Sequence, residues 1–387
     1  MKPQAPERFV RVALENWRNF AHVDVQVQRR AFLVGPNASG KSNLLDVFRF
    51  LHDIVKLGGG FREAVGARGG VSKIRSLSAR RYPDVAIRVE LASKGEQPVW
   101  EYELRFSQDN LRRPVIAGEK VSSLGNVYFQ RPLPEDKEDP ERLGQTYLEQ
   151  VNVNREFRAV ADFFRSVRYL HIVPQLIREP DRSVGRKDDP YGGDFLEQVS
   201  RTQERTLAAR LRRIADALRV AVPQLEDLEL WKDERGTPHL RGRYEHWRPR
   251  GAWQTEEQFS DGTLRLLGLL WAALDGAGPL LLEEPELSLH PEVVRFIPQM
   301  FARLQRQTGR QILVSTHSSD LLRDTGIGID EVLLLTPASE GTTVEPASRF
   351  DEIRILLEGG LSLAEAVVPH ARPTRVEQLA LFGDERE

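Results

Sequence analysis

The sequence predicts an α/β protein with a mixed, mainly parallel core sheet, an antiparallel β subdomain and a helical insertion. Three observations predict this fold class. A glycine-rich motif, "GPNASGKS" at residues 35–42, stands between an apolar run and a helical pattern. From residue 279 onward, short apolar runs alternate with helical patterns, as in a parallel sheet. At residues 84–92 and 99–106, apolar residues recur at every second position, which is typical of antiparallel strands with one exposed face.

The N-terminal part supplies a hairpin, a buried strand and a helix. Residues 9–20 and 22–27 predict two short strands joined by a turn. The continuous apolar run "AFLVG" at 31–35 is typical of a buried strand, and the residues after the motif follow a helical pattern to position 55. Residues 57–80 are rich in glycine, and we expect them to be irregular.

The middle of the chain is less regular. Residues 131–143 are a charged, proline-bearing loop, and helical patterns follow at about 153–166 and 194–221. A hairpin is expected near 225–247. We therefore divide the chain into four segments: the N-terminal part of one lobe at 1–130, a helical insertion at 131–225, the C-terminal part of the lobe at 226–347, and a helical tail at 348–387.

Composition limits the classes of protein to be considered. The chain has 387 residues, a formal net charge of −2 and no cysteine, which excludes disulfides, thiolate zinc sites and cysteine nucleophiles. No apolar run approaches the roughly 18 residues of a membrane helix, and the N-terminus lacks an apolar signal core. We expect a soluble cytoplasmic protein that does not enter a membrane.

The motif at 35–42 has the spacing G-x-x-x-x-G-K-S of a phosphate-binding loop, with a strand before it and a helix after it. Gly35 and Gly40 let backbone N–H groups turn toward phosphates, and the helix N-terminus adds its positive dipole end. Lys41 supplies a cation to the phosphate oxygens, and Ser42 offers a hydroxyl to Mg²⁺. The alternative, an accidental match in a glycine-rich turn, does not account for the flanking strand and helix.

Two carboxylates follow the apolar strand in "PLLLEEPELSLHP" at residues 279–291. Ligands of open α/β sheets lie at the carboxyl ends of strands, so Glu283 is placed to hold Mg²⁺, with Glu284 placed to polarise an attacking water. In the general form of this motif, the first of the two acids is Asp. Glu283 is one methylene longer, which favours contact with Mg²⁺ through water over direct ligation. The alternative is a strand that ends in solvated acids.

Two further positions suit a phosphate site. His317 follows the apolar strand "QILVST" and could hydrogen-bond a γ-phosphate, although a lone histidine can equally be structural. Ser260, Asp261 and Gly262 open a leucine-rich helix, where exposed N–H groups would bind an anion. The alternative there is a plain helix N-cap, and the two interpretations are compatible.

Together these motifs resemble the ATP-binding-cassette type of ATPase found in the RecF, SMC and OLD-like families. The match includes the N-terminal "LENWRNF" and covers about 8–56 and 255–337. The resemblance implies an ABC-type P-loop NTPase that uses ATP and Mg²⁺, with Glu284 and His317 as catalytic residues and Ser42 and Glu283 at the metal. It implies nucleotide contacts from Gly35, Asn37, Ala38, Ser39, Gly40, Lys41, Ser42 and Asn43, and from Ser260, Asp261 and Gly262. No glutamine can be assigned to the Q-loop of this family.

In the families it resembles, two lobes face each other head to tail, and the P-loop of one closes with the signature of the other on one ATP. The resemblance therefore implies a homodimer with two composite sites. OLD nucleases carry a TOPRIM domain with an acidic D-x-D element after the ATPase. The sequence contains no D-x-D and has little chain after His317, so we expect an ATPase without a TOPRIM domain. Small OLD-like ATPases are often paired with a separate, nuclease-like effector in bacterial defence against phage.

Nucleic acid remains an alternative partner, as in a RecF-like DNA-repair ATPase. Arginines are frequent at 201–219, and arginine is mixed with Tyr244 and Trp247 at 239–250, a composition suited to backbone contact and base stacking. We predict that the face carrying Arg210, Arg213 and Trp247 contacts nucleic acid or an acidic partner. The alternative is an arginine-rich solvated face. A transporter ATPase is disfavoured, because neither a transporter-style signature nor a clear Q-loop is visible.

Overall fold

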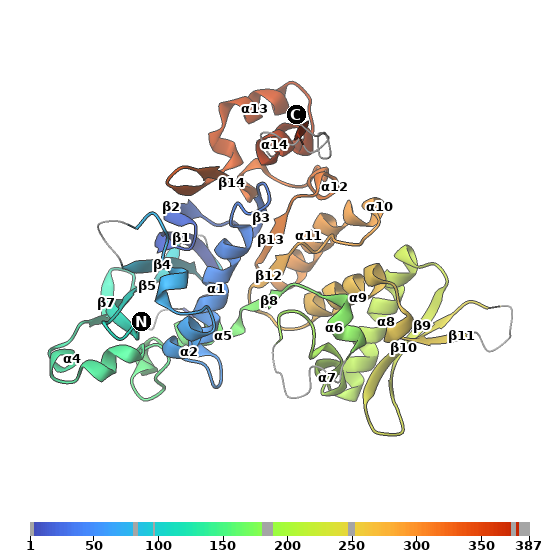
Figure 1. The fold of residues 1–387 in the computed structure, drawn as a ribbon. Coiled ribbons are helices and arrows are strands. Elements are labelled where there is room, and N and C mark those ends of the chain that lie inside the picture. Colours follow the sequence, from blue (N-terminus) through green and yellow to red (C-terminus); the bar gives the residue numbers. More distant parts are fainter. Residues whose placement is uncertain are drawn as a thin grey trace, which may run out of the picture.

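The computed structural model describes residues 4–79, 84–95, 97–179, 189–246, 252–372 and 377–378. These residues form a three-cornered body around a central sheet (Figure 1). An antiparallel sheet lies at the lower left of the view, and helices with a small three-stranded sheet lie at the lower right. Helices α13 (Asp351–Glu358) and α14 (Leu363–Ala371) lie at the top.

The central sheet confirms the predicted mainly parallel α/β core. Its strand order is β15-β14-β3-β13-β12-β8, and every neighbouring pair is parallel except β14 with β15. Strand β3 is buried at all five of its positions, as its apolar run predicts. The six strands are β3 (Arg30–Val34), β8 (Arg168–Leu170), β12 (Leu280–Glu283), β13 (Ile312–Thr316), β14 (Val332–Ala338) and β15 (Gly341–Pro346).

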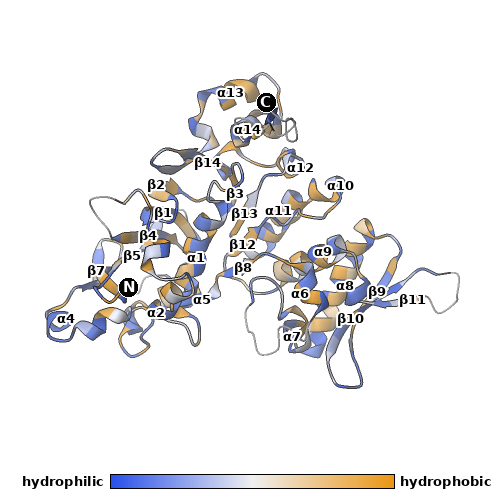
Figure 2. Cartoon of the chain, viewed as in Figure 1, coloured by the Kyte–Doolittle hydropathy of each residue, from blue (hydrophilic) through white to orange (hydrophobic). Residues whose placement is uncertain are grey.

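Side chains alternate between the two faces of this sheet and divide the hydrophobic core in two. Leu281 and Leu313 pack in one cluster, with α1 (Lys41–Val55) and α5 (Arg158–Ser166). Leu282 and Val314 pack in a second cluster, with α9 (Asp261–Leu274) and α11 (Ile297–Thr308). Helices α1 and α9 therefore cover opposite faces of the core sheet. Figure 2 shows that these helices carry both hydrophobic and hydrophilic residues.

The antiparallel sheet packs on the α1 side, where its apolar positions join the same core cluster. Its strand order is β2-β1-β4-β5-β6-β7, and all neighbours are antiparallel. The strands are β1 (Arg8–Trp17), β2 (Phe20–Gln26), β4 (Val85–Ala92), β5 (Pro98–Gln108), β6 (Pro114–Ser123) and β7 (Asn126–Arg131). The turn between β1 and β2 places Asn19 beside the glycine-rich motif, which matters for the site.

A third, three-stranded sheet projects from the α9 side in the order β11-β10-β9. It follows the longest helix, α8, whose apolar face packs against α9 and β9. These elements are α8 (Glu204–Ala221), β9 (Leu225–Lys232), β10 (Pro238–Tyr244) and β11 (Ala252–Thr255), and the remaining helices are α2 (Phe61–Gly66), α3 (Val71–Ile74), α4 (Pro134–Glu138), α6 (Pro174–Arg178), α7 (Phe195–Ser200), α10 (Pro291–Val294) and α12 (Ser319–Leu322).

Several local expectations differ from the structure. The glycine-rich stretch 57–80 contains the short helices α2 and α3 rather than only irregular chain, and the helical pattern at 194–221 is divided into α7 and α8. Residues 291–308 likewise form two helices, α10 and α11, because Pro298 in the first turn of α11 prevents continuation from the preceding helix. Strand β8, within the expected helical insertion at 131–225, belongs to the core sheet.

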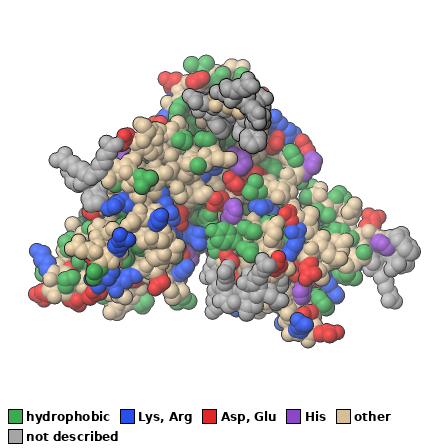
Figure 3. Space-filling view, in the orientation of Figure 1, with side chains coloured by type: hydrophobic (Ala, Val, Ile, Leu, Met, Phe, Trp, Pro, Cys, Tyr) green, Lys and Arg blue, Asp and Glu red, His purple; other side chains and the backbone are tan. Residues whose placement is uncertain are grey.

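The face of the molecule drawn in Figure 3 has no single electrostatic character. Figure 3 shows basic and acidic side chains interspersed over the face in view, in line with the net charge of −2. Among the described residues, no helix is long and apolar enough to span a bilayer.

Candidate nucleotide-binding site

The glycine-rich motif lies at the carboxyl end of β3 and opens α1. Gly40 has φ of 96°, a conformation that suits glycine, and a Cβ on Gly40 would collide with the Asn19 side chain. A Cβ on Gly35 would lie 2.5 Å from the Leu335 carbonyl oxygen. No side chain caps the N-terminus of α1, so its first N–H groups remain available to an anion.

Lys41 is buried and folds back over the loop. Its Nζ donates to the carbonyl oxygens of Gly35 at 2.9 Å and Pro36 at 3.0 Å. Burial lowers the pKa of the Lys41 ammonium, while the carboxylates of Glu284, Glu286 and Glu283 oppose that shift. Both acceptors are neutral carbonyl oxygens, so the Lys41 ammonium can turn to a phosphate without breaking an ion pair with either of them.

The crest of the loop faces solvent. Asn37 and Ala38 are exposed, whereas the Ser39 side chain is buried. Asn43 makes two contacts within the protein: its Nδ2 donates to Asn19 Oδ1 at 2.8 Å, and its carbonyl oxygen accepts from Trp17 Nε1 at 2.8 Å. These two contacts brace the start of α1 against the β1–β2 turn.

Asn19, which sequence reasoning missed, fixes the loop from outside. Its Nδ2 donates to the Ser39 carbonyl oxygen at 2.9 Å and to Thr342 Oγ1 at 2.8 Å. The β1–β2 turn and strand β15 thereby hold the loop from two distant parts of the chain. The "WRNF" segment belongs to the N-terminal motif "LENWRNF", but no neighbouring residue indicated which groups the Asn19 side-chain amide would bind.

The two carboxylates at the end of β12 take different partners. Glu283 accepts hydrogen bonds from Ser42 Oγ at one oxygen and from the Tyr169 hydroxyl at the other. The predicted metal pair, Ser42 and Glu283, is therefore brought together although the residues are 241 positions apart. Burial, followed by the neighbouring Glu283 carboxylate, raises the pKa of the Tyr169 hydroxyl, which stays protonated and donates.

Glu284 leaves the strand in an unusual backbone conformation. Its φ is 44°, in the left-handed region, and its Oε1 lies 3.2 Å from Nδ1 of His317. The structure thus brings together the two residues expected to act on the γ-phosphate and its attacking water. The carboxylate of Glu284 is half-buried and the imidazole of His317 is exposed, so both can be reached from solvent.

Glu286 is a second residue that sequence reasoning missed. It is buried, its Oε1 accepts from Thr316 Oγ1 at 2.6 Å, and burial raises the pKa of its carboxyl group. Thr316 also accepts from the Ser318 amide at 3.0 Å, so Glu286 ties the loop after β12 to the exit of β13 that carries His317. The sequence "EEPE" at 283–286 contains this third acid, but nothing in the pattern predicted that Glu286 would be buried.

The polar start of α9 is an N-cap, as one of the two interpretations predicted. Ser260 Oγ accepts from the Thr263 amide at 3.1 Å, and the Ser260 hydroxyl is itself exposed. Asp261 is held by Arg178 at 2.6 Å, and a Cβ on Gly262 would lie 2.6 Å from the Ser288 carbonyl oxygen. Asp261 therefore holds α6 against α9 rather than facing solvent alone.

The N-terminal ends of α1 and α9 belong to helices on opposite sides of the core sheet. The helix that follows the glycine-rich motif and the helix that Ser260 caps cover opposite faces of that sheet. Figure 1 shows α1 and α9 on either side of β12 and β8. Both helix ends have exposed polar groups at their tips, in Asn37 and Ser260, so each can be covered by another molecule.

The residues present fit ATP with Mg²⁺. A cavity of about 560 Å³ borders Ser42, Asn43 and Glu283, so it adjoins the expected metal pair, whereas Lys41 does not line it. Ser42 and Glu283 supply the oxygen ligands that Mg²⁺ prefers, either directly or through water. When bound, the metal would neutralise phosphate charge. Lys41 and the N–H groups of α1 would hold the phosphates, and Glu284 would accept the proton of the attacking water.

The fold and these motifs are those of an ABC-type P-loop ATPase. A family model described as "AAA domain, putative AbiEii toxin, Type IV TA system" matches residues 30–324. Because this match spans well over half of the chain, the protein belongs to that family. No curated protein matches it.

Solved SMC heads have the same fold at low sequence identity. A crystal structure of an SMC head bound to the C-winged helix domain of ScpA has a TM-score of 0.53 at 12% identity, covering 87% of this chain and 96% of that one. Head domains from Pyrococcus furiosus, bound to the C-terminal domain of ScpA, and from Pyrococcus yayanosii, with a coiled coil and joint, each have a TM-score of 0.51 at 11% identity. Each of these two matches covers 91% of this chain and 99% of the SMC head chain.

Proposed function

We propose that this protein is an ATP-hydrolysing switch that dimerises head to tail on ATP and Mg²⁺ and controls a separate effector. The observation that carries the proposal is the placement of α1 and α9 on opposite faces of the core sheet. A phosphate held at Lys41 cannot then lie at the Ser260 cap of the same subunit. A second subunit in the reverse orientation would supply that cap, as a symmetric dimer allows.

The residue roles in this proposal follow from the contacts. Gly35, Gly40 and Lys41 hold the nucleotide phosphates, and Ser42 and Glu283 hold Mg²⁺. Glu284 is the base, and His317, within 3.2 Å of it, responds to the γ-phosphate. Ser260 and the N–H groups near Gly262 close the site from the partner subunit, so hydrolysis would release the dimer.

The effector and its setting rest on the family and on the resemblance. The family description names a putative AbiEii toxin and a type IV toxin–antitoxin system. We propose that closure of the dimer controls a separate, nuclease-like protein in bacterial defence against phage. The SMC heads bound to ScpA domains illustrate such a fold carrying a partner protein, although they are similar to this chain in fold alone.

A second candidate function, DNA binding of the RecF kind, is favoured by one groove. Arg205, Arg210 and Arg213 on α8, with Leu274, border a groove of about 370 Å³. Arg210 is committed elsewhere, because it pairs with Asp275 at 2.9 Å and its guanidinium lies over the Trp271 ring. Of the predicted contact face, Arg213 therefore remains available, and Trp247 lies outside the described residues. The groove adds Arg205, which was not part of that prediction.

Nucleotide-dependent mass tests the switch. With Glu284→Gln to trap bound ATP, light scattering after size exclusion should show a dimer with ATP and Mg²⁺ and a monomer with ADP. Adding Lys41→Ala to this variant is the matched control, because it should stay monomeric with ATP. A Glu284→Gln protein of the same mass under all conditions would refute the switch. The effector is then sought by testing the product of the neighbouring gene for binding to the trapped dimer.

A further inference from the structure

Tyr169 occupies a position that none of the nucleotide-binding motifs predicts. It lies on β8, next to β12 in the core sheet, with Tyr169 opposite Leu281 in the parallel register. Glu283 is two residues beyond Leu281, so it lies on the same sheet face as Tyr169 and diagonally toward the carboxyl end. A tyrosine side chain is long enough to span this diagonal, and its hydroxyl donates to Glu283 Oε2.

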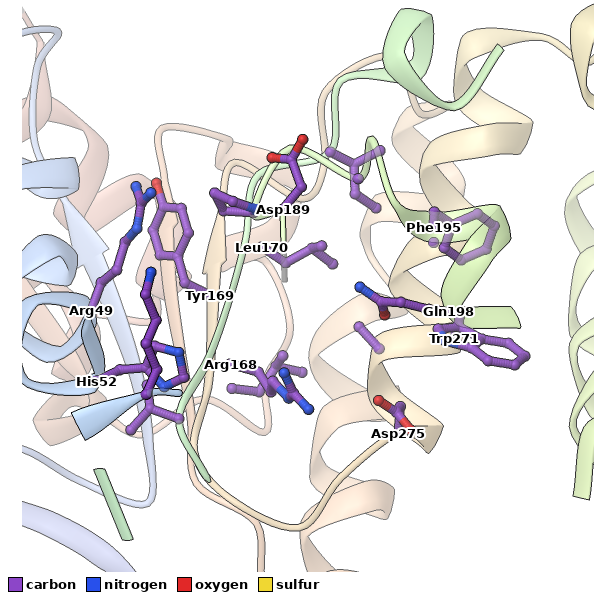
Figure 4. Close-up of a pocket in the computed structure, with 18 of the residues that line it drawn as sticks. Arg49, His52, Arg168, Tyr169, Leu170, Asp189, Phe195, Gln198, Trp271 and Asp275 are labelled. Carbon is purple, nitrogen blue, oxygen red and sulfur yellow. The ribbon is translucent and has the colours of Figure 1, made fainter. Parts of the chain in front are cut away.

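The other side of the Tyr169 ring is held by the helix that starts at the phosphate-binding loop. Arg49 lies seven residues after Ser42, two turns along α1, so both side chains face β8 and β12. The Arg49 guanidinium carbon lies 5.1 Å from the centroid of the Tyr169 ring. Figure 4 shows Arg49 and Tyr169 side by side, one reaching from α1 and the other from β8.

The contacts form one connected set: Arg49 against Tyr169, Tyr169 to Glu283, and Glu283 to Ser42. Glu283 carries one methylene more than aspartate, so its carboxylate has an additional rotatable bond and needs more restraint. With one oxygen held by Tyr169, only the oxygen that meets Ser42 remains directed to the metal position.

We infer that Tyr169 is a positioning residue for the metal-binding carboxylate: it holds one oxygen of Glu283 so that the other faces Ser42 and Mg²⁺. The inference rests on the proposed function, since it assumes that Ser42 and Glu283 receive the metal of a Mg–ATP complex. Tyr169 touches neither metal nor nucleotide in this role. Outer partners of metal-binding carboxylates commonly change metal affinity by about tenfold or more when removed.

The test is a double-mutant cycle read by nucleotide binding in the full-length protein. Tyr169→Phe removes only the hydroxyl and keeps the ring against Arg49. Calorimetry measures ATP binding in EDTA and across a Mg²⁺ titration. We expect Tyr169→Phe to raise the half-saturating Mg²⁺ concentration about tenfold while leaving ATP binding in EDTA unchanged. The matched control is Tyr128→Phe, whose ring lies against Trp100 in the antiparallel sheet and should leave both measurements unchanged.

The second arm uses Glu283→Asp, which is expected to be too short to keep the Tyr169 contact. If Tyr169 acts through Glu283, adding Tyr169→Phe to Glu283→Asp should give no further loss. Wild-type Mg²⁺ dependence in Tyr169→Phe, additive losses in the double variant, or weakened binding in EDTA would each overturn the inference while leaving the proposed function intact. A wild-type protein that binds ATP without any effect of Mg²⁺ would overturn both.

Discussion

At the residue scale, the site depends on a few side chains held in defined conformations. Glu284 has a left-handed backbone at φ of 44°, which costs a non-glycine residue about 1 kcal/mol or more. This conformation turns its carboxylate out of the strand alternation and toward His317. Such local strain is typical of functional positions, and it supports a catalytic role for Glu284 over that of a solvated strand end.

Replacing Glu284 with glutamine tests this role. We expect Glu284→Gln to keep ATP binding while hydrolysis falls by about 10²- to 10⁴-fold, because an amide cannot accept the proton of the attacking water. Phosphate release and nucleotide binding measure the two effects separately. Lys41→Ala is the contrasting control and should lose binding. Hydrolysis at the wild-type rate in Glu284→Gln would show that the two carboxylates have been assigned wrongly.

The residues that the sequence predicted are those with local signals. The motif at 35–42 and the pair Glu283 and Glu284 stand directly after apolar strands, and the structure brings Ser42 to Glu283. Asn19 and Tyr169 could not be predicted, because each acts across a contact between elements distant in the chain. A single sequence carries the spacing of a motif, whereas the partners that hold it are set by tertiary packing.

At the element scale, the orientation of α9 is restrained by its close approach to the loop after β12. Gly262 lies where a Cβ would come within 2.6 Å of the Ser288 carbonyl oxygen, so the start of α9 and that loop touch backbone to backbone. Arg178 and Asp261 tie α6 to the same end of α9. The N-terminal end of α9 is therefore coupled to the segment that carries Glu284.

Gly262→Ala tests that coupling. We expect it to destabilise the fold by about 1–3 kcal/mol, because the added methyl group forces the helix start away from the backbone of the loop. Denaturant unfolding measures the change. Gly66→Ala is the matched control, since no atom lies within 4 Å of its added Cβ, and it should be neutral or slightly stabilising. Equal stability of the two variants would contradict the close approach.

The arginines of α8 give a second test at this scale. We expect the double charge reversal of Arg205 and Arg213 to leave basal ATPase activity intact. It should weaken DNA binding and lower the salt slope by about two, if the groove contacts phosphates. Filter binding at several salt concentrations measures this, and the double reversal of two other exposed arginines, Arg155→Glu with Arg349→Glu, controls for the same change in net charge. Unchanged DNA affinity and unchanged effector capture in the double variant would support the alternative interpretation, that these arginines form a solvated face without a partner.

At the scale of the whole molecule, periodicity predicted the architecture better than the boundaries. The parallel core and the antiparallel strands follow from runs of apolar residues with clear spacing. Strand β8 was missed because it has only three residues, Arg168–Leu170, and its apolar pattern is too short to distinguish it from the neighbouring helices. The division of 194–221 into two helices likewise has no proline or glycine to announce it.

The same architecture leads to the central claim, that one complete site needs two subunits. The core sheet separates the helix after the phosphate-binding loop from the helix capped by Ser260, and both ends carry exposed polar groups. Ser260→Arg should therefore spare folding and ATP binding in the free subunit, while its long cation blocks closure. Lys41→Ala should lose ATP from its own loop and keep an intact Ser260 cap.

Mixing these two inactive variants is the most direct measurement. In a heterodimer, the intact loop of the Ser260→Arg subunit faces the intact Ser260 of the Lys41→Ala subunit, so one of the two composite sites is complete. We predict that ATPase activity, absent from either variant alone, partly returns on mixing and rises with the fraction of heterodimer measured by native mass spectrometry. Heterodimers without activity, or a Ser260→Arg protein that hydrolyses ATP normally as a monomer, would contradict the claim.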